Sequence, residues 1–233
     1  MKDYSKHHVH FCIPCYAGQL TEATFTSFIR FMLIAQQRGL NWSLDTLVNE
    51  SLITRGRNNL TAKMLKNEKA THLMFIDSDI RFNAEDIFKL LDSDKDVVGG
   101  LYPVKSYPIR YVVNGITDPD KEGELEEVRH IGTGFMMIRR NVFETMIERL
   151  PEKKFKDSIG IGKDFEPFMY ALFETCLDND GHYMSEDWYF CDMWRKMGGK
   201  IFAHKGIVLN HTGYHEFRGD LGALADARTS DKT

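Results

Sequence analysis

The chain has 233 residues, 42% of them hydrophobic and 27% charged, and its formal net charge is -4. This composition is ordinary for a folded globular protein, and the length favours one domain with at most a small appendage. The charge excludes a global attraction to nucleic acid or anionic membranes and leaves only a local basic patch open. The polar start lacks a signal peptide, and no apolar run reaches the ~18 residues of a membrane span, so we expect an intracellular protein.

The first hundred residues alternate between strand and helix four times. Short apolar runs predict strands at residues 9–13, 41–48, 71–76 and 96–101, with helices at about 21–39, at 54–66 and from 83 onward. In the first helix, the apolar positions expected to form one face are Phe25, Phe28, Ile29, Met32 and Leu33. This alternation is typical of an α/β fold with a mostly parallel central sheet and helices on both sides.

Two cysteines of the opening segment, Cys12 and Cys15, form a CxxC pair that in other settings binds zinc or carries redox chemistry. Here the pair straddles the end of the first predicted strand, and no second CxxC follows. Four cysteines are also too few for the disulfide scaffold of a secreted chain of this length. We therefore expect reduced, structural cysteines.

The second half of the chain is less regular. Strands are predicted at 128–131 and 135–138, at 168–176, at 200–203 and at 207–210. Helices are predicted at 142–149 and at 186–197, the latter capped by Ser185. Residues 153–167 contain three glycine or proline breakers and read as a loop, and the last dozen residues read as a frayed tail.

The sharpest motif is IDSDI, in which Asp77 and Asp79 stand just past the third predicted strand. In an open parallel sheet, ligands bind outside the carboxyl ends of the strands. Two carboxylates in one turn can converge on Mg²⁺ or Mn²⁺, which prefer oxygen ligands and often bridge protein to phosphate. The alternative is an ordinary acidic turn.

A basic cluster opens the second predicted helix, in SLITRGRNNL. Arg57 and Asn58 could lie beside a diphosphate, since an arginine fork matches phosphate oxygens and helix N-termini attract anions. Arg55 is expected on the opposite face of the helix. The alternative is a solvated helix turn.

Three later motifs add candidate residues. In HIGTGFMMI, Gly132 and Gly134 flank Thr133 and could let the backbone approach a ligand closely, or form a simple tight turn. In SEDW, Glu186 and Asp187 occupy the first turn of a capped helix, where an acid could complement the helix dipole or act as a general base. In HTGYHEF, His211 could be a third metal ligand or a diphosphate contact.

In chain order, the segments IPCYAG, TRGRNN, FIDSDI, VVGGLYP, GTGFMMIRR, SEDWYFC and HTGYHEF resemble the GT-A glycosyltransferases, over roughly residues 9–220. The resemblance is closest to small glycosyltransferase-like proteins of phages, large viruses and bacteria. It implies a Rossmann-like GT-A fold in a single domain, 1–220. Residues 1–101 would be the nucleotide-sugar-binding half, residues 102–220 a smaller, mixed acceptor-binding half, and residues 221–233 a tail.

The resemblance also implies roles for single residues. Asp77 and Asp79 would hold Mn²⁺ or Mg²⁺ on the donor diphosphate, with His211 as the third protein ligand. Arg57 matches the family's arginine near the donor, and Asp187 matches the acid that is the base in inverting members, with Glu186 as the alternative. The rest of the donor site would include Pro14, Tyr16 and Asn49 or Glu50 around the nucleoside, together with Asn58, Ser78, Gly132, Thr133 and Gly134.

The expected function is metal-dependent transfer of a sugar from a UDP- or GDP-linked donor to a hydroxyl of a glycan or glycoprotein, in the cytoplasm, or in the host cytoplasm for a viral protein. One alternative is a phage enzyme acting on hydroxymethylated DNA bases, for which Lys153, Lys154 and Lys156 could contact phosphate. Another is a nucleotide-sugar nucleotidyltransferase, although CIPCYAGQLTEA lacks its Gly-rich, Lys-containing signature. A third is a non-catalytic sugar-binding domain. The stereochemistry, inverting or retaining, stays open.

Overall fold

The computed structural model describes residues 2–220, so the expected tail, 221–233, lies outside the described residues. The first half confirms the predicted alternation of strands and helices. Its elements are β1 (His8–Cys15), α1 (Glu22–Gln37), β2 (Asn41–Val48), α2 (Ile53–Lys66), β3 (His72–Ile76), β4 (Ile80–Arg81), α3 (Ala84–Asp92) and β5 (Val97–Gly100).

The second half is built from shorter elements. These are β6 (Val113–Asn114), β7 (Lys121–Glu122), β8 (Leu125–Glu127), β9 (His130–Ile131), β10 (Phe135–Arg139), α4 (Arg140–Arg149), the 3-10 helices η1 (Pro151–Lys153) and η2 (Lys163–Phe168), β11 (Cys176–Leu177), β12 (Tyr183–Met184), α5 (Glu186–Lys196), β13 (Phe202–His204), β14 (Asn210–Thr212) and β15 (Glu216–Arg218).

Two strand predictions for this half are wrong. Residues 168–176 do not form a strand, because the N–H groups of Leu172 and Phe173 are bonded by the Asn58 side chain instead of a neighbouring strand, both at 2.9 Å. Residues 207–209 run between β13 and β14 without a ladder partner, and only Asn210 of the predicted strand is paired, as the first residue of β14. Their apolar side chains Ile207 and Leu209 are nevertheless buried in the core.

The central sheet has eight strands among the described residues, in the order β2-β1-β3-β10-β5-β13-β8-β7. The pairs β1–β2, β1–β3 and β13–β5 are parallel. β10 lies antiparallel between β3 and β5, and β8 lies antiparallel to β13. The sheet is therefore mixed with a mostly parallel core, as the strand–helix alternation predicts.

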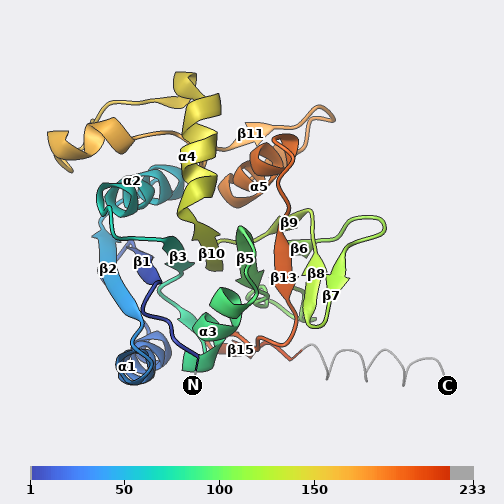
Figure 1. Cartoon of the computed structure of the whole chain (residues 1–233). Coiled ribbons are helices and arrows are strands. Elements are labelled where there is room, and N and C mark those ends of the chain that lie inside the picture. Colours follow the sequence, from blue (N-terminus) through green and yellow to red (C-terminus); the bar gives the residue numbers. More distant parts are fainter. Residues whose placement is uncertain (1, 221–233) are drawn as a thin grey trace.

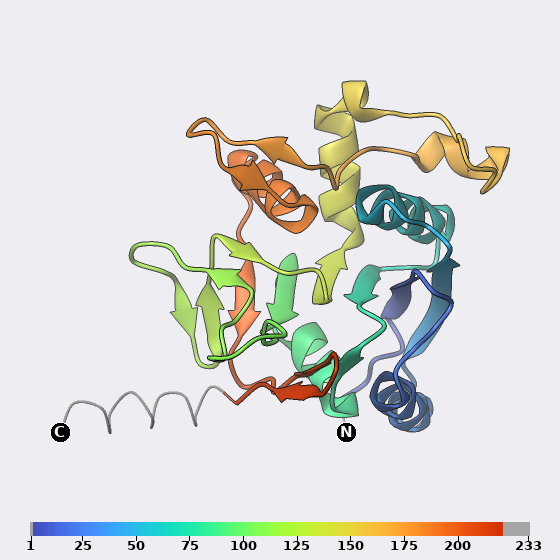
Figure 2. The ribbon, with the colours of Figure 1, turned by 180° about the vertical axis from the view of Figure 1, so that it is seen from behind.

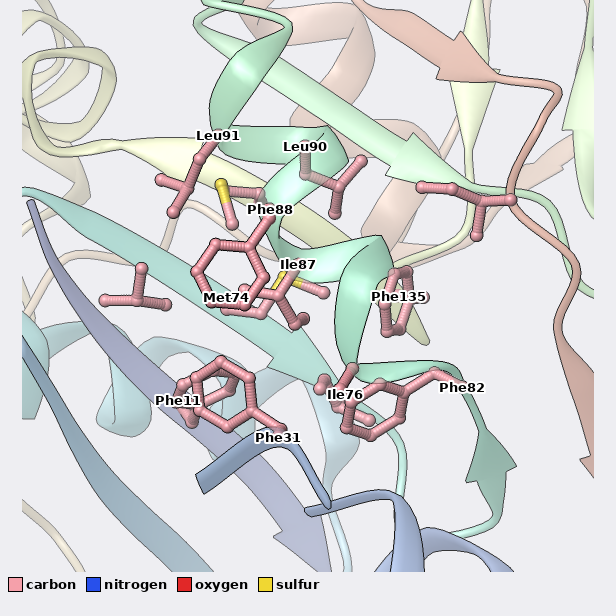
Figure 3. Close-up of a cluster of buried hydrophobic side chains, with 14 of the residues drawn as sticks. Phe11, Phe31, Met74, Ile76, Phe82, Ile87, Phe88, Leu90, Leu91 and Phe135 are labelled. Carbon is pink, nitrogen blue, oxygen red and sulfur yellow. The ribbon is translucent and has the colours of Figure 1, made fainter. Parts of the chain in front are cut away.

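Helices cover both faces of this sheet (Figure 1). α1 and α3 pack on one face, and α2, α4 and α5 on the other, because successive side chains of a strand point to opposite faces. In Figure 3, Phe11 of β1 and Met74 of β3 meet Phe31 of α1 and Phe88 of α3 in one buried cluster. Burial of this much apolar surface on both faces fixes the sheet as a rigid platform for the loops at its edges.

A small second sheet, β15-β14-β4, lies beside the central one, with β15 at the bottom of Figure 2. β4 begins immediately after the Asp77–Asp79 turn, and β14 pairs with it so that His211 lies opposite Ile80. The N–H of Thr212 donates to the carbonyl of Asp79 at 2.9 Å. The C-terminal histidine is thus carried back to the acidic turn by strand pairing.

Two further expectations concern the cysteines and the membrane. All four cysteines are free thiols, as expected, with Cys12 buried in the α2 face of the core and Cys15 in the α1 face. Between residues 2 and 220, no helix has the length and apolar character needed to cross a bilayer.

Candidate active site

The Asp77–Asp79 turn begins where β3 ends. All five residues of β3 are buried, and the turn that follows is more exposed and can therefore hold ionised side chains. The backbone holds the turn in place, because the N–H of Asp77 donates to the Gly134 carbonyl at 3.0 Å and the N–H of Ile80 donates to the Asp77 carbonyl at 3.2 Å. Both carboxylates therefore project from a fixed backbone.

Arg57 is a buried cation held between two acids. Its Nη2 donates to Asp77 Oδ1 at 2.8 Å and its Nε to Glu186 Oε1 at 3.3 Å, and only 4% of its side chain is exposed. The guanidinium also lies over the ring of Phe75, with its central carbon 4.9 Å from the ring centroid. Burial by itself lowers the pKa of Arg57, but Asp77 and Glu186 outweigh it, so the pKa lies above its ordinary value and the group stays charged.

Asp79 is engaged on both of its oxygens. Oδ2 accepts from Nζ of Lys105, and Oδ1 lies 3.3 Å from Nε2 of His211. Burial raises the pKa of Asp79, but the hydrogen bonds from His211 and Lys105 outweigh it, and the net shift is downward. Asp79 is therefore an ionised carboxylate in a setting that attracts cations.

The geometry of His211 fits a metal ligand. Its Nδ1 lies 2.8 Å from the Pro103 carbonyl, which can only accept, so Nδ1 carries the proton and donates it. Nε2 then faces Asp79, 3.3 Å from its Oδ1. A backbone carbonyl that fixes the tautomer in this way is the usual support of a metal-bound histidine. Asp79 and His211 could thus offer two ligands to a divalent ion, and an imidazole with a carboxylate favours Mn²⁺ over Mg²⁺. The ligand atoms of Asp77, Asp79 and His211 do not all come within 4.8 Å of one another, so the structure does not bring the predicted set of three ligands together.

Asp77 completes this side of the site without touching Asp79 or His211. Its Oδ1 accepts from Arg57, and its Oδ2 lies only 2.9 Å from the place that a Cβ on Gly134 would occupy. A side chain at residue 134 would therefore displace this oxygen. The Asp77 carboxylate keeps lone pairs for a second partner, since each of its two oxygens can accept more than one bond.

Asp187 stands at the N-terminus of α5. Its Oδ1 accepts from the Ser185 hydroxyl and from the Trp188 N–H, the latter at 2.8 Å, which leaves Oδ2 unused by either bond. Burial raises the pKa of Asp187, and the neighbouring charge of Glu186 raises it further. A carboxylate with a raised pKa and one free oxygen is suited to accept a proton.

The two glycines of the GTG segment make room for Tyr102. A Cβ on Gly132 would lie 2.1 Å from the Tyr102 hydroxyl oxygen, and one on Gly134 would lie 2.7 Å from Cζ of the same ring. The Tyr102 hydroxyl accepts from the Gly134 N–H at 3.1 Å. Burial raises the pKa of Tyr102 well above its ordinary value, helped by Asp77 and Asp187, so the phenol stays protonated. The glycines thus seat a tyrosine and do not line the cavity themselves.

One cavity of about 450 Å³ gathers most of the predicted residues. The predicted residues that line it are Pro14, Tyr16, Glu50, Arg57, Asp77, Ser78, Asp79, Thr133, Glu186, Asp187 and His211. It is also lined by Leu47, Ser51, Ile53, Gly56, Tyr102 and Lys105. Predicted residues from six of the seven quoted segments therefore meet at the carboxyl ends of β1, β2 and β3, where the parallel sheet is expected to bind a ligand.

Besides Gly132 and Gly134, two more of the predicted donor residues do not line the cavity. The Asn58 amide is bonded to backbone groups of Leu172 and Phe173, including a bond from Nδ2 to the Phe173 carbonyl at 3.0 Å. It therefore fastens α2 to the second half of the chain. Asn49 has a left-handed backbone (φ 59°), and its N–H donates to the Tyr16 carbonyl at 3.0 Å. It joins the loop after β1 to the end of β2 outside the cavity.

The sequence reasoning missed Tyr102 and Lys105. Both follow β5 in the segment VVGGLYPVK, whose glycines offered a signal. A Cβ on Gly100 would lie 2.8 Å from side-chain carbons of both Ile207 and Leu209. The end of β5 therefore packs so closely against these two residues that it has no room for a side chain. Glu50, which was offered only as an alternative to Asn49, lines the cavity and is held by Nε and Nη2 of Arg55 at 2.7 and 2.9 Å.

A different group of potential metal ligands lies in the turn between β11 and β12. Among residues 2–220, three ligand atoms come within 4.8 Å of one another only at Asp178, Asp180 and His182. This exposed cluster could hold a metal ion. Its carboxylates already close the turn, because Asp178 Oδ1 accepts from the N–H groups of Asp180 and His182 at 3.0 and 2.8 Å. None of the three residues lines the 450 Å³ cavity.

Comparison with known proteins supports the fold. No model of a protein family matches the chain, and no curated protein matches it. Among solved structures, A197 from STIV is similar at a TM-score of 0.52 and 20% identity, over 88% of this chain and 86% of that one. This similarity is evidence of a shared fold.

Two other structures align less closely. A glycosyltransferase involved in the glycosylation of the major capsid of PBCV-1 has a TM-score of 0.31 and 13% identity, over 68% of this chain and 72% of that one. A 4-diphosphocytidyl-2C-methyl-D-erythritol synthase from Anaerococcus prevotii has a TM-score of 0.35 and 12% identity, over 82% and 99%. The predicted α/β class is confirmed by the mixed sheet with its mostly parallel core and by the fold that the chain shares with A197.

Proposed function

We propose that this protein is a metal-dependent glycosyltransferase that moves a sugar from a nucleotide-diphosphate donor to an acceptor hydroxyl with inversion. One observation carries the proposal. A single cavity is lined by a pair that could bind a cation, Asp79 and His211, and by a separate carboxylate, Asp187, whose pKa is raised and whose Oδ2 is not used by the bonds from Ser185 and Trp188. A site for a leaving diphosphate and a site for a departing proton thus face the same space.

The leaving group needs positive charge, because the diphosphate becomes more negative as its bond to the sugar breaks. A Mn²⁺ or Mg²⁺ ion held by Asp79 and His211, in the cavity that Asp77 also lines, would neutralise that charge. Arg57 adds a cation that is already fixed by Asp77 and Glu186 and so requires no reorganisation during the reaction.

The acceptor hydroxyl needs a base. In the proposed step Asp187 Oδ2 takes the hydroxyl proton, the acceptor oxygen forms a bond to the anomeric carbon, and the bond from that carbon to the diphosphate oxygen breaks. The proton ends on Asp187 and the electron pair on the diphosphate. Glu186 is less suited to this role because its carboxylate is used by Arg57 at 3.3 Å.

The remaining lining suggests where the nucleoside lies. Pro14, Tyr16 and Glu50 belong to the loops that follow β1 and β2, on the first half of the chain. We place the nucleoside there, so that residues 1–101 bind the donor. Residues 102–220, which contribute Asp187 and His211, would then bind the acceptor. Both halves would belong to one domain.

Donor binding is expected to require a divalent metal. Calorimetry with UDP and with GDP would be run in Mn²⁺ and again in EDTA, followed by a panel of nucleotide sugars to find the one that is hydrolysed. Equal affinity in EDTA would remove the metal from the proposal. Release of pyrophosphate from a nucleoside triphosphate and a sugar phosphate would instead identify a nucleotidyltransferase.

Arg57→Ala is expected to weaken nucleotide binding more than Arg55→Ala, because Arg57 lines the cavity while Arg55 reaches only Glu50. Arg57→Ala should also lower the free energy of unfolding by about 3–5 kcal/mol, since it leaves two acids without their buried partner. Urea unfolding and nucleotide titration of the two variants test this. Equal effects on the Kd for nucleotide would contradict the assignment.

A further inference from the structure

Lys105 occupies a position that the proposed function leaves unexplained. It lies in the segment between β5 and β6, lines the cavity, and donates from Nζ to Asp79 Oδ2. The other oxygen of Asp79 faces His211 Nε2. The carboxylate proposed to bind the metal ion is therefore paired with a lysine in the structure.

A metal ion and Lys105 would compete for Asp79. A divalent cation bound to this carboxylate would repel the ammonium group beside it, because like charges at such separations disfavour each other strongly when partly buried. Lys105 can give way, since 37% of its side chain is exposed and its ammonium sits on a flexible four-carbon stem.

The backbone around Lys105 cannot move far with it. The Pro103 carbonyl accepts from His211 Nδ1, and the Val104 N–H donates to the Arg110 carbonyl at 2.7 Å. The ring of Tyr107 is stacked on His215, with centroids 5.6 Å apart. Because the segment is fastened on both sides of Lys105, an ammonium displaced from Asp79 stays at the mouth of the cavity.

We propose that Lys105 is a catalytic residue that occupies Asp79 until metal and donor bind, and then contacts the donor diphosphate. This inference rests on the proposed function. The displaced ammonium needs a new anion, and the diphosphate is the anion that arrives together with the metal. Lys105 would then share with Arg57 the stabilisation of the leaving group.

The test exploits the opposite effects expected on metal binding and on turnover. In Lys105→Met, which keeps the aliphatic stem, Mn²⁺ alone should bind about fivefold or more tightly, because its competitor is gone. The kcat for sugar transfer should fall by about 10²-fold, because one cation has been removed from the leaving group. Lys105→Arg should restore both values toward those of the unmodified protein.

The matched control is Lys205→Met. Lys205 pairs with Glu126 at 2.7 Å, is 42% exposed, and does not line the cavity. Its replacement should change neither value. Calorimetry with Mn²⁺, and with UDP and GDP at saturating Mn²⁺, gives a readout that is independent of turnover.

Three results would overturn the role of Lys105: weaker Mn²⁺ binding in Lys105→Met, unchanged Mn²⁺ binding, or normal kcat. If the unmodified protein bound neither Mn²⁺ nor UDP nor GDP, the proposed function itself would fail, and Lys105 with it. If the unmodified protein bound Mn²⁺ and a nucleotide, but Lys105→Met had the same Mn²⁺ affinity and kcat as Lys205→Met, only the role of Lys105 would be contradicted.

Discussion

Asp187→Asn is expected to lower the rate of sugar transfer by about 10²–10⁴-fold while the fold and the affinity for donor survive. Asparagine can place its Oδ1 where the aspartate has it, so the bonds from Ser185 and Trp188 that begin α5 are kept. What is lost is the basic oxygen. Transfer to acceptor and slow donor hydrolysis would both be measured in the purified variant, and transfer should fall more.

The control for this variant lies on the same helix. Asp192 pairs with Lys196 at 2.7 Å and does not line the cavity, so Asp192→Asn should leave the rate unchanged. Near-normal transfer by Asp187→Asn would mean that this acid only complements the helix dipole, worth about 0.3–1 kcal/mol of stability. The base would then be Glu186, or the mechanism would be a retaining one that needs no such base.

The pH profile of transfer offers an independent check on Asp187. A base works when deprotonated, so transfer should fall as the pH drops through the pKa of Asp187, which burial and then Glu186 raise above its ordinary value. Glu186→Gln removes one of the two causes. The acid limb of the profile should therefore move to lower pH in that variant, although Asp187 itself is unchanged.

Asp79→Asn is expected to abolish metal-dependent donor binding and to slow transfer by about 10²–10³-fold. Stabilisation of a leaving group by a metal is worth several kcal/mol, and each 1.36 kcal/mol is about a factor of ten in rate. An amide keeps the size of the side chain but not the negative charge that attracts the ion. Mn²⁺ titration and steady-state kinetics would be compared in the variant and the unmodified protein.

Asp180→Asn is the matched comparison, because it removes one acid from the exposed cluster at the β11–β12 turn. If donor binding depends on the cavity, this variant should behave as the unmodified protein does. Loss of metal-dependent donor binding in Asp180→Asn but not in Asp79→Asn would place the functional ion at the turn and contradict the site assignment.

The sequence predicted secondary structure best where the hydrophobic pattern of a segment matches its burial in the fold. Strands that are buried on both faces read as short apolar runs, and β3 is one of them, so the turn at Asp77 could be placed at a sheet edge in advance. Pairing of β14 with β4 was not readable from pattern. It joins residues about 130 positions apart, since His211 lies opposite Ile80, and the motif around the histidine gave no indication of this pairing.

Helix α1 shows why an apolar pattern can mislead. The expected face contains Phe25, Ile29 and Leu33, yet these side chains are 54%, 39% and 59% exposed. The helix instead buries Thr24, Ser27, Phe28, Phe31 and Ala35. The hydroxyl of Thr24 bonds the Ile80 carbonyl at 3.0 Å, and that of Ser27 accepts from the Phe82 N–H at 3.2 Å. Hydrogen bonds to the chain after the acidic turn thus rotate the helix away from the face that hydrophobicity alone selects.

The missed residues Tyr102 and Lys105 have a common cause. Their importance lies in what they touch: the hydroxyl of Tyr102 meets the Gly134 N–H, and the ammonium of Lys105 meets Asp79. Neither partner is close in sequence, and a tyrosine or a lysine in a loop carries no periodic signal. Asn58 was misplaced for the same reason, because its amide is taken by backbone groups more than a hundred residues away.

The position of β5 has a consequence for how the chain acquires its structure during synthesis. Among residues 2–220, β5 pairs only with β10 and β13, both of which are synthesised later, while β1 can pair with β2 and β3 as soon as they are made. When the ribosome has released only the first hundred residues, Val97 and Val98 have no neighbouring strand to join. The emerging chain would therefore contain a three-stranded sheet together with an apolar segment that has not yet paired. At this stage the exposed apolar segment would be a binding site for a chaperone.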